Sequence, residues 1–236
     1  MTGSIRRIQA IFIKDWQDFL KNQYMLFTAL LPLLTAAWIK RAGDGSIEIM
    51  IWPITLAFVV AGSFLQAGTI AEEKEKNTLR NLLLTPVSTT EIFIAKSLLS
   101  SLLTIGIVVV VIYLSGFSLP PSLPLFFLAI LISLMIYVAI GTILGLLSRT
   151  VIETSVVGMP VLILFGMGTM IKQAIDLPVL SRVIEYLPNE SLIQITTGLE
   201  EGVPFSAISS HFFILLVWMI VSIVVTVYIY GKRRFD

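Results

Sequence analysis

The sequence predicts an all-α integral membrane protein with six transmembrane helices. Of its 236 residues, 56% are hydrophobic and only 13% are charged, and the mean hydropathy is +0.94. A soluble domain, with roughly 45–50% apolar and about 25% charged residues, could not hide this much apolar surface from water. Six stretches have about the length and apolarity that a helix needs to cross a bilayer. They are residues 23–39, 49–70, 97–115, 124–147, 155–171 and 211–230.

None of the six stretches contains Asp, Glu, Lys or Arg. The fifth is interrupted by Gly158, Pro160, Gly166 and Gly168, which makes it the weakest helix prediction of the six. Charged residues within the first 22 positions break any continuous apolar core there. We therefore expect no cleavable signal peptide, and the first span itself would direct the chain to the membrane.

Basic residues are distributed unevenly between the two sides of the predicted bundle. Twelve of the 16 lysines and arginines lie on the side of the two termini, and four lie on the other side. Because cytoplasmic segments of membrane proteins carry the excess of Lys and Arg, we expect both termini in the cytoplasm. The first group comprises Arg6, Arg7, Lys14, Lys21, Lys74, Lys76, Arg80, Lys96, Arg149, Lys232, Arg233 and Arg234; the second comprises Lys40, Arg41, Lys172 and Arg182.

Residues 4–21 have the pattern of an amphipathic helix. Apolar residues recur at steps of three or four, which places them on one helical face. We expect this helix to lie along the cytoplasmic membrane interface. The pattern fits an ordinary juxtamembrane anchor equally well. The apolar face comprises Ile5, Ile8, Phe12, Trp16 and Phe19, and the polar face Arg7, Lys14, Asp18 and Lys21.

The segment between the second and third spans is the most informative part of the sequence. The charged run 72–76 should extend the second helix beyond the membrane. A short helix over 78–85 then follows, and Pro86 ends it. Ser88 and Glu91 have the spacing of a capping box, which starts the next helix. Physical reasoning alone leaves two alternatives for the short helix, a contact for a partner or a surface helix on lipid headgroups. Its apolar face is formed by Leu79, Leu82 and Leu83.

The run Glu73-Lys-Glu-Lys-Asn-Thr-Leu-Arg-Asn-Leu-Leu-Leu-Thr-Pro-Val-Ser88 resembles the signature of the type-2 ABC exporter permeases. In that family the run forms a coupling helix that docks into a separate ATPase subunit. One departure is Asn77, where the family commonly has glycine, and asparagine also tolerates turn conformations. The resemblance implies these ATPase-docking residues: Glu73, Glu75, Thr78, Leu79, Arg80, Leu82, Leu83, Thr85 and Pro86.

The resemblance extends over the whole chain. Prolines divide residues 172–210 into two short apolar-striped patches, 179–187 and 189–199. The family has paired re-entrant helices at this place, which help to close the exit; without the resemblance, a surface loop with two amphipathic turns would also fit. The family's architecture places the translocation pathway at the second and fifth spans. The residues implied there are Phe58, Gly62, Gln66, Met159 and Phe165.

The energy for transport should come from outside this chain. Secondary transporters usually carry ionisable residues inside their spans, and here the predicted spans have none. Coordination of Na⁺ by backbone carbonyls and hydroxyls stays open. The chain also lacks the G-x-x-x-x-G-K-[ST] phosphate loop. We therefore expect ATP and Mg²⁺ on a separate ATPase subunit and no cofactor, metal or catalytic residue on this one. The absence of cysteine excludes disulfides and thiolate metal sites.

The resemblance therefore implies a permease subunit of an ATP-driven exporter in the plasma membrane of a prokaryotic cell. Six spans are half of what this family uses, so we expect a second copy, most simply in a homodimer. Apolar walls suit a drug, a lipid-like molecule or a peptide as the substrate, and Na⁺ or a polysaccharide stay open. We expect contact with membrane lipid and none with nucleic acid.

Two further alternatives depend on single residues. An intramembrane protease would need a positioned base, and the lone His211 at the start of the sixth span does not supply one. A channel or a structural membrane subunit is harder to separate from a permease by sequence.

Gly141 and Gly145 form a small-x-x-x-small pair, which favours close helix packing within one subunit over a contact between subunits.

Overall fold

The computed structural model describes residues 2–42, 46–76, 88–174 and 177–233. All regular structure in these ranges is helical. Six helices are long and apolar enough to cross a membrane, which confirms the predicted fold class. The six are Gln23–Ala42, Ile47–Glu75, Glu91–Ser115, Leu123–Leu147, Val151–Lys172 and Phe205–Gly231.

Helix bounds define the elements used below. The second span consists of α3, η1 and α4 in succession, where η marks a π-helical segment. The fifth span consists of α8, η2 and α9 in the same way. The elements are α1 (Thr2–Lys21), α2 (Gln23–Ala42), α3 (Ile47–Ala57), η1 (Phe58–Leu65), α4 (Gln66–Glu75), α6 (Thr89–Ser115), α7 (Leu123–Leu147), α8 (Val151–Val161), η2 (Leu162–Gly166), α9 (Met167–Ala174), α10 (Pro178–Glu185), α11 (Pro188–Glu200) and α12 (Phe205–Arg233).

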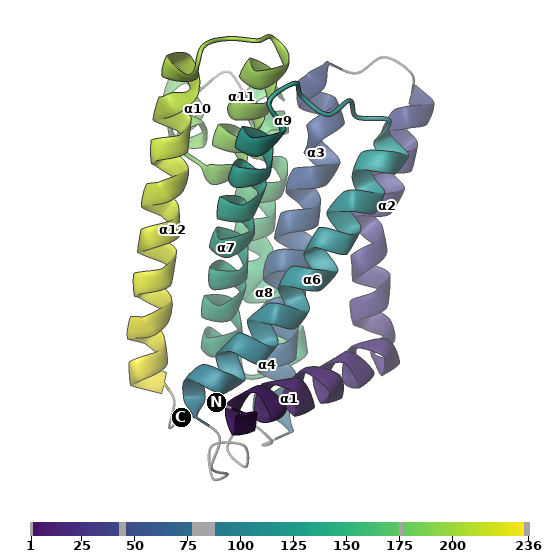
Figure 1. Cartoon of the computed structure of the whole chain (residues 1–236), viewed down its shortest axis with the longest axis vertical. Helices are drawn as coiled ribbons and strands as arrows, with labels where there is room; N and C mark the ends of the chain where they lie inside the picture. Colours follow the sequence, from purple (N-terminus) through teal and green to yellow (C-terminus); the bar gives the residue numbers. More distant parts are fainter. Residues whose placement is uncertain (1, 43–45, 77–87, 175–176, 234–236) are drawn as a thin grey trace.

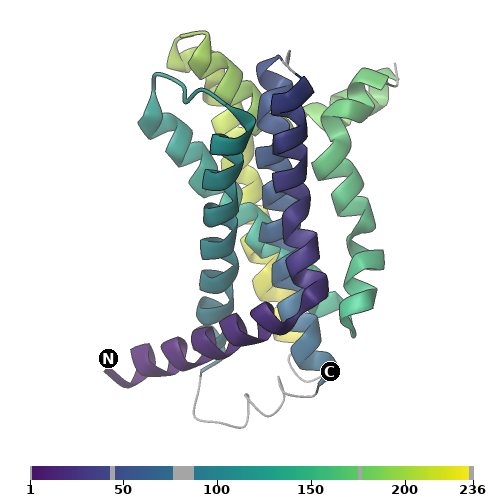
Figure 2. The same cartoon turned by 90° about the vertical axis from the view of Figure 1, so that its right-hand side faces the viewer.

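The long helices run side by side, and α1 lies across one end of them (Figure 1). We call this end the α1 end of the bundle; α4 and α12 finish there and α6 begins there. Figure 2 shows α1 crossing the same end in the perpendicular view, with α10 and α11 at the opposite end. The amphipathic segment predicted over 4–21 is therefore a helix that lies across the bundle, as an interfacial helix would.

Helix α1 turns only part of its apolar surface to the bundle. Ile11 and Phe19 are buried, and Ile11 packs with Ile92 of α6. Ile5 and Trp16, which belong to the predicted apolar face, are exposed. The buried stripe is thus displaced from the predicted one by about one helical position, and the exposed edge is left for the membrane.

Helix α6 begins eight residues before the apolar stretch that predicted it. The Ser88 Oγ accepts a hydrogen bond from the Glu91 amide, and the Glu91 carboxylate accepts one from the Ser88 amide at 2.8 Å. This arrangement is the capping box that the sequence predicted, and it satisfies two amides that the first turn of a helix leaves free. Gly116 ends the helix with φ of 73°, a left-handed conformation that glycine adopts without strain.

Helix α7 is packed closely against the second span. A Cβ atom on Gly145 would come within 2.8 Å of the carbonyl oxygen of Ala67 in α4. Gly141 lies against Ser63 of η1 in the same way. The small-residue pair therefore brings two helices of one chain together, as the sequence favoured.

The two short helices at the far end of the bundle differ in their burial. In α10, Val179 and Val183 are exposed, whereas the first turn of α11 is enclosed by other helices. Glu190 is 3% exposed. Its carboxylate accepts hydrogen bonds from Thr169 and Gln194, both at 3.1 Å. The bond from Thr169 joins α11 to α9, at the end of the fifth span, whereas the bond from Gln194 lies within α11.

Candidate functional site

Four successive residues at the end of α4, Glu72–Glu75, contact different neighbouring elements. An α-helix turns by about 100° per residue, so consecutive side chains point in different directions. Glu73 contacts α1 and α6. The others reach the α1–α2 junction, the end of α7 and the start of α8. These bonds join Asn22 Nδ2 to Glu72 Oε2 (3.4 Å), Lys74 Nζ to the Leu146 carbonyl (2.8 Å) and the Val151 amide to Glu75 Oε2 (3.1 Å).

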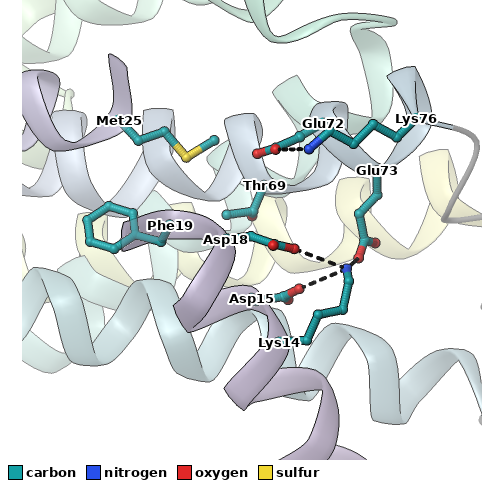
Figure 3. A pocket seen from close by; sticks show the side chains of 9 residues that line it. All are labelled: Lys14, Asp15, Asp18, Phe19, Met25, Thr69, Glu72, Glu73 and Lys76. Atoms are coloured by element: carbon teal, nitrogen blue, oxygen red, sulfur yellow. Dashed lines mark hydrogen bonds and ion pairs between the residues drawn. The ribbon is translucent and has the colours of Figure 1, made fainter. Parts of the chain in front are cut away.

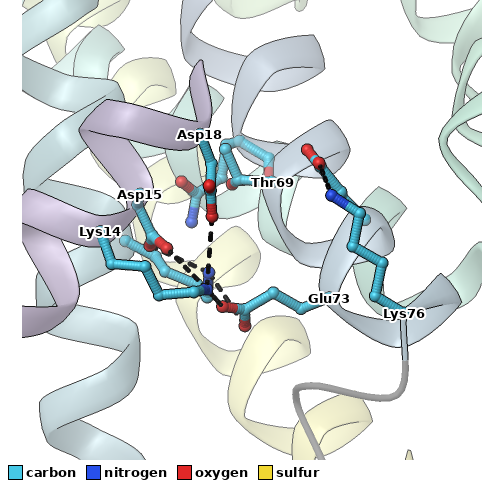
Figure 4. Close-up of polar contacts among 9 residues, drawn as sticks. Lys14, Asp15, Asp18, Thr69, Glu73 and Lys76 are labelled. Atoms are coloured by element: carbon cyan, nitrogen blue, oxygen red, sulfur yellow. Dashed lines mark hydrogen bonds and ion pairs between the residues drawn. The ribbon is translucent and has the colours of Figure 1, made fainter. Parts of the chain in front are cut away.

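A buried ion cluster joins α1, α4 and α6 at this end. Lys96 is 1% exposed, and its Nζ lies 3.0 Å from Asp15 Oδ2 and 3.0 Å from Glu73 Oε2. Lys14 Nζ lies 2.6 Å from the other oxygen of Glu73. Figure 4 shows Lys14, Asp15 and Glu73 converging from two helices. Two lysines and two carboxylates therefore compensate one another, which buried charges require.

Lys14 is the exposed member of the cluster. Its side chain is 42% exposed, and it also lies 3.4 Å from Asp15 Oδ1. Partial burial lowers the pKa of Lys14, but the hydrogen bond to Glu73 and the charges of Glu73 and Asp15 outweigh burial, so its pKa lies above the ordinary value. Lys14 is therefore protonated throughout the physiological range, and the cluster keeps its balance of charge.

A second ion pair joins α1 to the first turn of α6. Arg7 Nη2 donates to Glu91 Oε1 at 2.7 Å, and Arg7 Nε donates to Glu91 Oε2 at 3.1 Å. Ser4 Oγ donates to the same carboxylate. The hydrogen bond to Glu91 raises the pKa of Arg7. A bidentate pair fixes orientation as well as distance, so α1 is held to α6 at two points, Arg7 and Asp15, about two turns apart.

A small cavity of about 50 Å³ lies beside the ion cluster. Figure 3 shows that Phe19 and Met25 lie on one side of it and the charged side chains on the other. The salt bridge of Lys76 to Glu72, at 2.5 Å, lies at its edge, and this hydrogen bond raises the pKa of Lys76. The volume is enough for a few water molecules and too small for an organic substrate. The cavity is therefore too small for a substrate pocket, and the ion cluster beside it joins α1, α4 and α6.

Only two of the predicted docking residues lie in the described part of the chain. Glu73 is 4% exposed and directed into the ion cluster, so it acts inside the subunit and offers little surface to a partner. Glu75 is exposed and accepts the Val151 amide. The predicted helix 78–85 and Pro86 lie outside the described residues. What the structure describes is the set of contacts on either side of that segment.

The predicted pathway residues are mostly packed inside the subunit. Phe58 is 1% exposed and stacks on Tyr137, and Phe165 meets the edge of the same ring. A Cβ atom on Gly62 would lie 3.1 Å from the Cβ of Tyr137. In this structure these three residues therefore fill the space between helices of one chain. Of the five predicted residues, Met159 alone has an exposed side chain, at 50%.

Gln66, the remaining residue of the predicted pathway set, links three spans. It is 0% exposed; its Oε1 accepts from Ser100 Oγ at 2.6 Å, and its Nε2 donates to Thr142 Oγ1 at 3.0 Å. Both ends of the amide are satisfied within the subunit, which explains how so polar a group lies inside an apolar bundle. Here Gln66 stabilises the packing of α4, α6 and α7.

The sequence did not predict that Lys14, Asp15 and Lys96 meet Glu73 in an ion cluster. Asp15 lies four residues after Ile11 and four before Phe19, both of which are buried. Lys96 is flanked by apolar residues at the start of a span. A charge within an apolar pattern signals a buried partner, but neither position says which residue that partner is.

The fold and the site together define a polytopic α-helical membrane protein, in which an ion cluster connects the ends of two spans to a helix across the bundle end. The chain matches the profile described as ABC-2 family transporter protein over residues 28–228. It belongs to this family and is the membrane permease subunit of an ABC transporter. Such subunits transport and are generally not catalytic, and membership implies association with an ABC ATPase subunit. No curated protein matches the chain.

Proposed function

We propose that this permease is part of an ATP-driven exporter of a drug, a lipid-like molecule or a peptide. A separate ATPase subunit, which binds ATP and Mg²⁺, drives it through the predicted coupling helix over residues 78–85. The observation that carries this proposal is the ion cluster of Asp15, Glu73 and Lys96, which binds the end of α4 and the start of α6 to the same helix, α1. A force applied between α4 and α6 therefore acts on a fixed joint.

The contacts of α4 give such a force a route into the bundle. Lys74 holds the end of α7, and Glu75 holds the start of α8. Packed helices joined by salt bridges move as units and do not deform continuously. A displacement of the segment that follows α4 would thus reach the second, third, fourth and fifth spans together.

The pathway itself would form between two copies of the chain, at the second and fifth spans. These are the two spans that contain π-helical segments, η1 and η2, and such segments occur frequently at functional sites. The exposed side of the fifth span carries Ile152, Val156 and Met159, which offers an apolar surface for a second copy. The simplest assembly is a homodimer with one ATPase per chain.

The location follows from the distribution of charge. Basic residues gather at the α1 end, where α1 begins and α12 finishes. The rule that cytoplasmic segments carry Lys and Arg places this end in the cytoplasm, where ATP is available. We propose the cell membrane of a prokaryote, with both termini inside.

Replacing Leu82 and Leu83 together with aspartate tests the docking role. We expect the chain to insert normally, and we expect the co-purified ATPase to fall by at least about tenfold, because two charges on an apolar contact must be desolvated on docking. The measurement is the amount of phosphate-loop protein of roughly 200–300 residues that co-purifies with the permease, together with ATP-dependent transport across a compound panel.

Leu119→Asp is the matched control, because Leu119 is 47% exposed and lies in the α6–α7 connection at the opposite end. It should leave both the co-purified ATPase and transport unchanged. If the Leu82→Asp/Leu83→Asp variant retains the ATPase and transports at the normal rate, the predicted helix over 78–85 is not the docking element.

A further inference from the structure

An apolar groove of about 580 Å³ lies between α6, α7 and α12. Its lining runs from Met135 near the middle of α7 to Phe93 and Tyr230 at the α1 end, so it occupies the half of the bundle nearer α1. We call it the α6–α12 groove. The three helices are spans, so the groove lies within one leaflet of the bilayer. Besides Met135, Phe93 and Tyr230, the lining of the groove includes Ser97, Ser101 and Thr226.

The groove contains an unused hydroxyl group at its α1 end. The Tyr230 hydroxyl oxygen is buried and has no hydrogen-bond partner among the described residues. The ring of Tyr230 is held edge-on to Phe93, with ring centroids 4.5 Å apart. By contrast, Thr226 donates to the carbonyl of Ser222 at 2.7 Å. Buried hydroxyls are normally paired, so the Tyr230 hydroxyl indicates a ligand oxygen at this end of the groove.

Positive charge follows directly on the groove in the sequence of α12. The groove-lining residues of α12 are Ile223, Thr226, Val227 and Tyr230, which share one face of the helix. The helix ends in Lys232 and Arg233, and Arg234 follows in the sequence. Basic residues beside the end of a span attract anionic lipid headgroups.

The carboxylate nearest this end along α6 does not oppose an anion. Glu91 lies two residues before Phe93, and its charge is compensated by the bidentate pair with Arg7. The groove therefore has an apolar body, a free hydroxyl near one end, and a basic helix terminus beyond that hydroxyl. This order of chemistry is that of a phospholipid: acyl chain, ester and phosphate.

We propose that the α6–α12 groove binds an anionic phospholipid of the inner leaflet. One acyl chain lies along Ser101 and Met135. An ester or phosphate oxygen accepts a hydrogen bond from the Tyr230 hydroxyl, and the phosphate lies at the end of α12. The site is separate from the joint at Asp15, Glu73 and Lys96, and it does not depend on what the transporter exports.

The test is native mass spectrometry of the full-length protein titrated with phosphatidylglycerol or phosphatidylcholine. We expect the wild-type chain to retain one phosphatidylglycerol with clear preference over phosphatidylcholine. Lys232→Gln/Arg233→Gln should weaken phosphatidylglycerol binding by about 30-fold, because each basic residue contributes about fivefold near a membrane surface. Lys40 and Arg41 lie in the last turn of α2, at the end of the bundle opposite to α1. Lys40→Gln/Arg41→Gln should therefore leave phosphatidylglycerol binding unchanged.

A second pair of variants tests the groove itself. Ser101→Phe places a ring in the space that the acyl chain would occupy and should abolish retention of the lipid. Val109→Phe adds the same ring on α6 at a residue that is 60% exposed and outside the groove, and it should have no effect. Equal retention of both lipids, or full retention by Ser101→Phe, would overturn the proposal. The proposal would also be overturned if Ser101→Phe abolished a dimer and left lipid retention unchanged, because the groove would then belong to an interface with a second copy.

Discussion

Replacing Lys96 with methionine is expected to lower the free energy of unfolding by about 3–5 kcal/mol, the usual cost of removing one partner from a buried ion pair. Lys96 is 1% exposed and neutralises both Asp15 and Glu73, which are 4% exposed each. Without it the two carboxylates share Lys14 alone, and one negative charge stays buried without compensation. Unfolding of the purified protein by SDS in mixed micelles measures the change.

Two controls make this result specific. Lys21→Met removes an exposed lysine from the same end of the protein and should cost less than about 0.5 kcal/mol. Combining Lys96→Met with Asp15→Leu and Glu73→Leu removes the cluster as a whole, and we expect most of the lost stability to return, because apolar replacements of buried ion pairs are often neutral or stabilising. If Lys96→Met is no more harmful than Lys21→Met, the cluster does not form in the folded protein.

The triple variant also separates stability from transport. It keeps the helices in place and removes the joint between α1, α4 and α6. If the ion cluster carries force from the ATPase, the triple variant should be stable, bind the ATPase and transport poorly. If it transports at the wild-type rate, the cluster contributes to stability only, and the route through α1 is wrong.

The spans and the start of α6 could be predicted because they depend on local patterns. Apolar length alone identifies a span, and the Ser88–Glu91 spacing alone identifies a capping box, which the structure contains. The ion cluster depends on Asp15, Glu73 and Lys96, which lie 81 residues apart from first to last. Nothing in a single sequence fixes how three helices are rotated against one another, so this meeting of charges was out of reach.

The role of Gln66 shows the same limit within one span. Its polarity, in an apolar stretch near Gly62 and Ser63, made it a candidate for the pathway. A polar side chain in a span either faces a pathway or finds partners on a neighbouring helix, and both choices give the same sequence. The structure pairs it with Ser100 and Thr142, residues 34 and 76 positions away.

The charged run before the leucine-rich segment was interpreted as one unit with that segment, because the family signature contains both. Of the two, the structure describes only the charged run. Glu73 and Lys74 are bonded to other helices of the subunit, at Lys96 and at the Leu146 carbonyl. The charged run therefore anchors the end of α4 in this chain, and the docking proposal applies to the segment that follows it.

Gly141→Ala is the second change for which we expect a large effect, a loss of about 1–3 kcal/mol in the free energy of unfolding, as for other overpacked sites. A Cβ atom there would meet the carbonyl oxygen of Ser63 and come within 2.8 Å of the Ser63 Cα and of the Gln66 Cβ. Two of these atoms belong to the backbone of η1, which cannot move aside by a change of rotamer. Helix α7 would have to move away from the second span.

The hydrogen bonds across this contact make the movement costly. Ser63 Oγ donates to the Tyr137 carbonyl at 2.8 Å, and Gln66 donates to Thr142 at 3.0 Å, so separation of the helices lengthens both bonds. Gly106→Ala is the matched control, since a Cβ there meets nothing within 4 Å. It should be neutral or stabilising by up to about 1 kcal/mol, because alanine favours the helix. Equal stability of the two variants would mean that α7 and η1 do not pack as closely as the structure has them.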